Sequence, residues 1–277
     1  MSNLTTRTVY GSELQTVLYT GRPFVVRPNT TLNEKLGILP GATPGAGNVP
    51  TLKLLCIGNG GHKYETSADG IPVNVTIKHD PTDAALYRQI PWVLRPSSSD
   101  LSTAERAKYA LRRARTYNSV NYIAYYGRRL DLTNPTLALE IETITNGSSA
   151  TSQFVPSPAN LSPTPLEIQD SGSNALNGQY VNVNLPTTLA LTAAEVAEII
   201  NACTIIHGNA NAAIISEIAL VSGSDRAITI ENGVSFNEVV AAQVNTFIGE
   251  YVSLVNTSQG YNGSYNLGAN EPLLRTL

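Results

Sequence analysis

Residues 120–126 read Val-Asn-Tyr-Ile-Ala-Tyr-Tyr, and this stretch decides the expected class of fold. Its residues fall into two alternating sets, one of which is Val120, Tyr122, Ala124 and Tyr126. Successive side chains of a strand point to opposite faces of a sheet, so the alternation predicts a strand. Because the turn residues 117–119 come directly before it, we expect the start of a sheet that carries long hairpins.

Short apolar runs elsewhere in the chain predict further strands. The strands predicted in this way are 16–19, 23–26, 52–57, 73–77 and the two arms of a hairpin, 214–221 and 227–230. The run 52–57 has the apolar character of a buried strand and leads into the glycine-rich turn 58–61. The first arm of the hairpin, 214–221, also fits a helix.

Three helix starts are predicted from serine or threonine followed three residues later by glutamate, the spacing of a capping box. The pairs are Ser102 with Glu105, Thr192 with Glu195, and Ser235 with Glu238. They predict helices over 103–115, from 193 to a stop at Gly208, and over about ten residues after Ser235. In 103–115, an alanine and leucine stripe that includes Leu111 lies opposite a row of arginines.

The composition favours a β-rich protein of the α+β class. Charged residues make up 14% of the chain, below the usual ~25%, and apolar residues make up 42%. Residues 39–50 contain three Pro and three Gly and predict an extended loop or arm, as does the tail from Thr257. We therefore expect a β-rich core of antiparallel strands with a few short helices and extended loops or arms.

Charge is distributed unevenly along the chain. Residues 1–129 hold 16 Lys and Arg against 8 Asp and Glu, whereas residues 130–277 hold 2 against 13. With a soft boundary in the proline-rich stretch 146–188, this predicts a basic α+β half with an N-terminal arm, 1–145, and an acidic α+β half with a C-terminal arm, 146–277. One continuous domain is the alternative. The basic and acidic halves can meet within one molecule or between neighbouring copies, or both can face solvent unpaired. We predict that they meet between neighbouring copies.

The sequence contains no recognisable catalytic or cofactor motif. The glycine-rich turn 58–61 lacks the spacing of a phosphate-binding loop, and the three histidines lie far apart in sequence. Cys56 and Cys203 lie among apolar residues, as core cysteines do. We therefore expect no enzyme activity, no organic cofactor and no metal; His62, His79 and Asp80 are the first residues to examine if a metal is found.

Membrane segments are likewise not expected. No apolar run approaches the ~20 residues of a membrane helix, and the first residues contain no hydrophobic segment of the kind that a secretory signal needs.

The strongest local signal is the basic, tyrosine-rich segment 88–129. It holds nine Lys and Arg against two acidic residues, with five tyrosines among them. Grooves that bind single-stranded nucleic acid have this composition, but Tyr and Arg are also enriched in protein interfaces. The acidic remainder of the chain favours the interface. The predicted interface residues are Arg106, Arg112, Arg113, Arg115, Arg128 and Arg129.

Several stretches resemble uncharacterised virion structural proteins of tailed bacteriophages. The resemblance lies in residues 57–62, 81–96, 100–113 and 122–126, and it covers most of the chain. It implies a non-enzymatic part built in several copies around a ring in the neck, tail or baseplate. The implied location is the virion, assembled in the host cytoplasm.

The resemblance also implies the partners, which are further copies of the chain and neighbouring virion proteins. The alternative function is nucleic-acid binding through segment 88–129. A third class, a glycan-cleaving tail enzyme, has no catalytic constellation in the sequence to support it.

Overall fold

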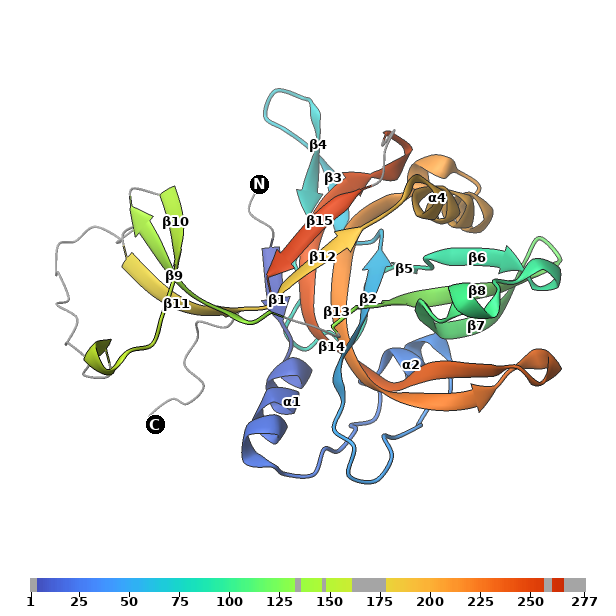
Figure 1. Cartoon of the computed structure of the whole chain (residues 1–277). Coiled ribbons are helices and arrows are strands. Elements are labelled where there is room, and N and C mark those ends of the chain that lie inside the picture. The colour runs from blue at the N-terminus through green and yellow to red at the C-terminus, as the bar shows by residue number, and fades with distance from the viewer. Residues whose placement is uncertain (1–3, 133–135, 146–147, 161–177, 257–260, 267–277) are drawn as a thin grey trace. The chain divides into compact units, whose positions relative to one another are not determined.

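A computed structural model describes residues 4–132, 136–145, 148–160, 178–256 and 261–266 (Figure 1). The chain folds into two compact units. Unit 1 comprises Met1–Leu130 and Leu191–Tyr261, and unit 2 comprises Asp131–Ala190 and Asn262–Leu277. Unit 1 is therefore built from two segments that are distant in sequence.

One antiparallel sheet forms the centre of unit 1. Its strand order is β1-β14-β13-β2-β8-β6, with β5 paired to β2 and β7 paired to β8. The strands are β1 (Leu4–Arg7), β2 (Thr51–Gly58), β5 (Gln89–Ile90), β6 (Val93–Pro96), β7 (Tyr109–Tyr117), β8 (Val120–Arg129), β13 (Ile214–Thr229) and β14 (Ser235–Ser253). A separate hairpin of unit 1 pairs β3 (His62–Thr66) with β4 (Pro72–Thr76).

Two predictions are wrong in the region of the longest strands, β13 and β14. The predicted hairpin around 222–225 is wrong, because 214–229 is one continuous strand that turns only at 230–234. The predicted helix after Ser235 is also wrong, because those residues form β14. Pairing along almost the whole of β13 supplies the backbone hydrogen bonds that a helix would otherwise make.

The helix predicted over 103–115 is wrong beyond its first turn. The capping box of Ser102 and Glu105 is confirmed, but α3 ends at Arg106 (Thr103–Arg106), and the remaining residues form β7. Residues 109–117 pair with β8 instead. A helix of this length is marginal in water on its own, so pairing with an adjacent strand outweighs the local helix signal.

Near the N-terminus, helix α1 (Val9–Thr20) replaces the strand predicted at 16–19, and residues 23–26 form no strand. The Thr8 hydroxyl accepts a hydrogen bond from the Gly11 amide and caps the helix start. The second short helix, α2 (Leu32–Leu36), has a complete capping box formed by Thr31 and Glu34.

Other predictions are confirmed. The strands expected at 52–57, 73–77 and 120–126 are present as β2, β4 and β8. Helix α4 (Ala193–His207) starts at the capping box of Thr192 and ends at Gly208, whose φ is 70°. Residues 39–50 form no helix or strand, as predicted for a loop.

Unit 2 consists of smaller sheets. Strands β9 (Ala138–Thr145), β10 (Ser148–Gln153) and β11 (Gly178–Asn184) form an antiparallel sheet of order β10-β9-β11. Strand β12 (Pro186–Ala190) pairs with β15 (Asn262–Asn266), which lies in the predicted C-terminal arm; residues 257–260 and 267–277 of that arm lie outside the described residues.

The short 3-10 helices, taken over both units, are η1 (Ser97–Ser99), η2 (Pro158–Asn160), η3 (Ala210–Ala212), η4 (Glu231–Gly233) and η5 (Leu254–Asn256). The fold thus belongs to the α+β class and is mostly β, with large antiparallel sheets and few short helices.

The core of unit 1 contains residues from both of its segments. Its members include Leu32, Leu54, Leu94, Leu111, Val239 and Phe247. Cys56 and Cys203 are buried free thiols, as expected, and burial raises the pKa of Cys203 to about 12.

Candidate functional site

Four of the six predicted interface arginines bind carboxylates within unit 1. Arg128 contacts Glu195 at 3.3 Å, and Arg129 contacts Asp225 at 2.6 Å. Arg106 and Arg112 both contact Asp100, at 3.4 and 3.3 Å. Arg112 also contacts Glu231 at 2.7 Å, and its side chain is only 10% exposed.

Many of these ion pairs join the basic and acidic halves of the sequence within one chain. The cross-half ion pairs are Lys53–Asp225, Arg95–Glu198, Arg112–Glu231, Arg128–Glu195 and Arg129–Asp225. The two halves of the sequence are therefore joined by ion pairs inside one molecule, which is not the contact predicted from the sequence. Contact between the opposite halves of neighbouring copies stays a prediction.

Arg113 and Arg115 differ from the other four arginines. Within the described part of the chain, neither has a carboxylate within ion-pairing distance, although both are half-buried. The Arg113 guanidinium lies against Gly37, where an added Cβ would be 3.0 Å from Nη1. The Arg115 guanidinium lies 6.0 Å from the centre of the Tyr126 ring, and its Nε donates to the Tyr126 hydroxyl at 3.3 Å.

Strand β7 positions these two arginines beside a pair of tyrosines. The register pairs Arg113 with Ala124, Arg115 with Tyr122 and Tyr117 with Val120. Residues two apart in a strand share a face, so Arg113, Arg115 and Tyr117 lie along one side of the hairpin. The rings of Tyr117 and Tyr122 are 6.1 Å apart.

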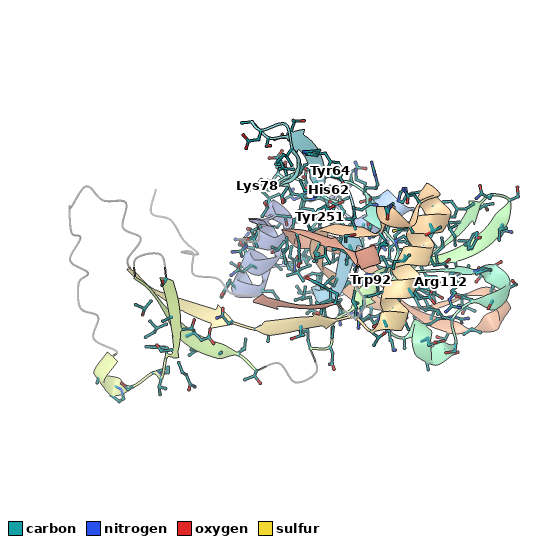
Figure 2. All side chains as sticks on the ribbon, turned by 90° about the horizontal axis from the view of Figure 1, so that it is seen from above. His62, Tyr64, Lys78, Trp92, Arg112 and Tyr251 are labelled. Carbon is teal, nitrogen blue, oxygen red and sulfur yellow. The ribbon has the colours of Figure 1, made fainter. Side chains whose placement is uncertain are left out.

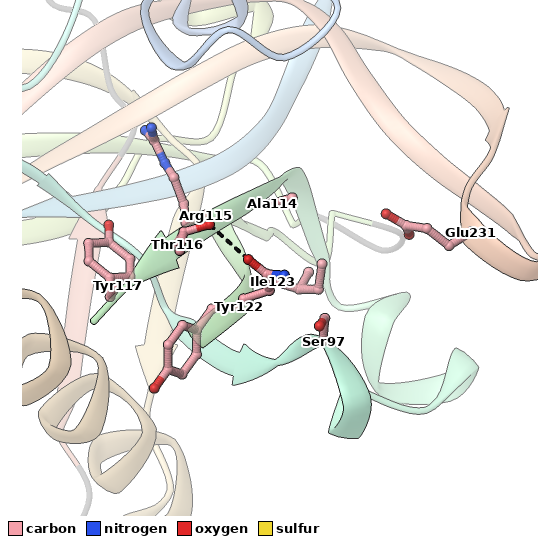
Figure 3. A pocket seen from close by; sticks show the side chains of 9 residues that line it. Ser97, Ala114, Arg115, Thr116, Tyr117, Tyr122, Ile123 and Glu231 are labelled. Atoms are coloured by element: carbon pink, nitrogen blue, oxygen red, sulfur yellow. Dashed lines mark hydrogen bonds between the residues drawn. The ribbon is translucent and has the colours of Figure 1, made fainter. Parts of the chain in front are cut away.

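A hollow of about 610 Å³ lies at this end of the β7–β8 hairpin (Figure 3). It is lined by Ser97, Ala114, Arg115, Thr116, Tyr117, Asn121, Tyr122, Ile123 and Glu231. The Thr116 hydroxyl donates to Asn121 at 2.8 Å and holds the two strands together near the turn. This lining offers hydroxyl, amide, guanidinium and aromatic groups to a partner. We take the hollow and the adjoining Arg113 as the candidate functional site.

Glu238 of β14 fixes the base of the same hairpin. Its buried carboxylate accepts hydrogen bonds from the Leu111 and Arg112 amides, the second at 2.9 Å. Leu111 has a φ of 57°, a left-handed conformation that leucine rarely adopts, and it interrupts the pairing of β7 with β8. Burial raises the pKa of Glu238, although these backbone amides act in the opposite direction.

A second buried carboxylate, Glu217 of β13, organises the glycine-rich turn. Its Oε1 accepts from the Gly60 and Arg88 amides at 3.0 and 2.9 Å, and its Oε2 accepts from the Tyr87 amide at 2.9 Å. A Cβ at Gly58 would lie 2.4 Å from Oε1, so glycine is needed there for close approach. The turn thus encloses a protein carboxylate.

His79 completes this cluster. Its Nε2 lies 2.9 Å from Glu217 Oε2, and its Nδ1 lies 2.8 Å from Asp83 Oδ2. The ring is stacked between Tyr87 and Phe247, at 4.0 and 3.8 Å. The His79 residue is 4% exposed and Glu217 is 1% exposed, so these two groups are closed off from solvent and link strands and loops, whereas Tyr87, which stacks on His79, is 49% exposed.

The residues named as first metal candidates do not come together. His79 is held by Glu217 and Asp83, and Asp80 is exposed on the surface. His62 packs edge-on against Tyr64 and Tyr251, at 5.6 and 5.0 Å (Figure 2). Over the described ranges, no group of three or more His, Cys, Asp or Glu is arranged to hold a metal ion.

Sequence reasoning missed Glu217 and Glu238. Glu217 is the single acid in the apolar run 214–221, and a lone acid in such a run is a usable signal of a buried, hydrogen-bonded carboxylate. Glu238 was assigned to a helix cap because of its spacing from Ser235. The sequence carries no comparable signal for its true role.

The chain belongs to a family that is described as a family of unknown function, DUF7208, and residues 1–276 match it. No curated protein matches the chain. No solved structure matches it either. None of the helices in the described ranges is long and apolar enough to span a membrane.

Proposed function

We propose that this protein is a non-enzymatic structural component of a tailed bacteriophage virion. In this role it forms part of a multi-copy ring in the neck, tail or baseplate by binding copies of itself and neighbouring virion proteins. The resemblance in residues 57–62 and 81–126 motivates the assignment to virions.

The observation that carries the self-association is a set of exposed apolar side chains on α1 and the segment after it. Leu18, Tyr19 and Val25 are 57%, 67% and 69% exposed, and Leu14 is the buried residue of the helix. Gly11 lies close to the Asn245 backbone of β14, which anchors the start of the helix. Each of these large apolar side chains costs free energy when it is left in water, and we infer that another copy of the chain covers them.

Light scattering and electron microscopy of the purified chain test the proposal. We expect a ring-like oligomer, and the predicted contact between oppositely charged regions of neighbouring copies should make it weaken as ionic strength rises past ~0.15 M, where the Debye length is ~8 Å. The triple variant Leu18→Ser, Tyr19→Ser and Val25→Ser should shift the protein towards monomer. Val255→Ser, which changes an exposed valine elsewhere, is the control. A monomeric wild-type chain, or its absence from purified virions by mass spectrometry, would contradict the proposal.

The alternative, nucleic-acid binding through segment 88–129, has less support. Five of its nine basic side chains already bind carboxylates: Arg95, Arg106, Arg112, Arg128 and Arg129. An ion-paired guanidinium is less available to a phosphate. Titration of labelled single-stranded DNA at several salt concentrations tests this alternative, because phosphate contacts give a steep salt dependence.

A further inference from the structure

The two units differ in charge. Unit 1 contains 17 Lys and Arg against 15 Asp and Glu, a balance of +2. The segments 131–190 and 262–277, which make up unit 2, contain one basic residue and six acidic residues, a balance of −5. The acidic residues of 191–261 thus lie in the same unit as the basic half, and the remaining excess of negative charge belongs to unit 2.

Arg113 and Arg115 in unit 1 carry positive charge that is complementary to the net negative charge of unit 2. They stand two residues apart on one face of β7, roughly 7 Å along the strand. Both are half-buried, and like charges that are neighbours on a sheet destabilise each other. An anionic partner would remove this repulsion and would use the planar guanidinium groups for paired hydrogen bonds.

We propose that the face formed by Arg113, Arg115, Tyr117 and Tyr122 binds the acidic unit 2 of a second copy of this chain. The proposal rests on the proposed self-association and adds to the apolar surface of α1 a second contact, between this face and unit 2. Because the two surfaces are different, the contact is head-to-tail, which closes into a ring when the rotation between copies allows.

The chemistry of the face fits a carboxylate-bearing protein surface. Arginine binds carboxylates through two parallel hydrogen bonds, and half-buried tyrosines supply flat apolar area with a polar end. Glu231, which also lines the hollow, is engaged by Arg112 at 2.7 Å. Arg112 and Glu231 thus form a closed pair beside two arginines that have no such partner among the described residues.

The test compares two double variants of equal charge. Arg113→Gln with Arg115→Gln removes the proposed contact, and Lys78→Gln with Arg226→Gln removes two exposed cations elsewhere in unit 1. In light scattering over a dilution series, we expect the first variant to associate at least about tenfold more weakly than wild type and the control to associate normally. Circular dichroism and thermal melting of both variants establish that each is folded.

A mixing experiment separates contact between copies from contact within one chain. Glu140→Gln with Glu142→Gln in β9 removes two acidic residues of unit 2 and should also weaken association. Each double variant keeps one of the two surfaces intact. When both variants also carry Leu18→Ser, Tyr19→Ser and Val25→Ser, an equimolar mixture of the arginine and glutamate variants should therefore recover a heterodimer that does not grow further.

Four results would overturn the inference. If wild type assembles and the arginine variant assembles equally well, the inference fails and the proposed function stands. If the mixture yields no heterodimer, the acidic unit does not bind this face of another copy. If single-stranded DNA binds to wild type and to the Lys78→Gln, Arg226→Gln control but not to the arginine variant, this face binds nucleic acid. A wild-type chain that remains monomeric would remove the proposed function as well.

Discussion

The base and the free end of the β7–β8 hairpin carry similar residues in different environments. At the base, Arg112, Arg128 and Arg129 each bind a carboxylate from residues 195–231. At the free end, Arg113 and Arg115 lie beside tyrosines, and the described residues offer them no ion-pair partner. The same residue type thus pairs with carboxylates at the base, whereas at the free end Arg113 lies against Gly37 and Arg115 against Tyr126.

This difference shows that composition alone cannot separate structural from interface arginines. Adjacent residues in a strand point to opposite faces, so Arg112 and Arg113 meet different surroundings although they are neighbours in sequence. What distinguishes them is which distant segment packs over each face.

The largest effect is expected at Leu111. Leu111→Asp places a carboxylate at a fully buried position of the core, which should lower the free energy of unfolding by about 4 kcal/mol or more. Ala114→Asp, an exposed position three residues further along β7, should change it by less than about 0.5 kcal/mol. Denaturant unfolding of both variants measures the contrast. Equal stability of the two variants would contradict the packing described for the hairpin base.

A smaller difference is expected between adjacent arginines. Arg112→Ala removes one partner of Asp100, whose side chain is 10% exposed, and also breaks the contact with Glu231. Together these losses should lower the free energy of unfolding by about 2–3 kcal/mol. Arg113→Ala should change stability by less than about 0.5 kcal/mol, or raise it slightly by relieving repulsion from Arg115. Thermal and denaturant unfolding decide between these values. A loss at Arg113 as large as that at Arg112 would mean that Arg113 is part of the fold.

The smallest expected effect is a pH dependence of stability that comes from Asp225, which pairs with Arg129 at the base of the β7–β8 hairpin. Burial alone would raise the pKa of Asp225, but hydrogen bonds from Lys53 and Arg129 outweigh it and lower the pKa below 3.8. A lowered carboxyl pKa contributes stability above the unfolded value, and this stability is lost as pH falls through the folded value. Since Asp225 is about one-third exposed, Asp225→Asn should cost only about 1 kcal/mol at pH 7.

At acidic pH the Asp225→Asn variant should have nearly the same free energy of unfolding as wild type, because the wild-type carboxyl is itself protonated there. Unfolding curves at several pH values, with the exposed Asp69→Asn as a control, measure this difference. A cost for Asp225→Asn that is constant from neutral to acidic pH would show that the ion pairs with Lys53 and Arg129 do not contribute.

The features predicted correctly from sequence depend on local interactions. The capping boxes at Ser102 and Thr192 are hydrogen bonds between residues three apart, and their spacing is visible in the chain. Strands β2 and β8 have apolar or alternating patterns that suit a sheet wherever they pair. The six arginines could be selected by composition, but their division into four with carboxylate partners and two without could not.

By itself, the sequence determined the β-rich class of this protein, the starts of α3 and α4, the loop at 39–50 and the charge asymmetry, because each depends on residue type and short spacing. Only the tertiary structure decided that 109–117 and 235–253 are strands, that Glu217 and Glu238 are buried acceptors, and which arginines are paired. The physical reason is that buried carboxylates and ion pairs join segments more than 100 residues apart, and that pairing with a neighbouring strand overrides the local helix signals at 103–115 and after Ser235. Their partners are set by packing, which a local pattern does not encode.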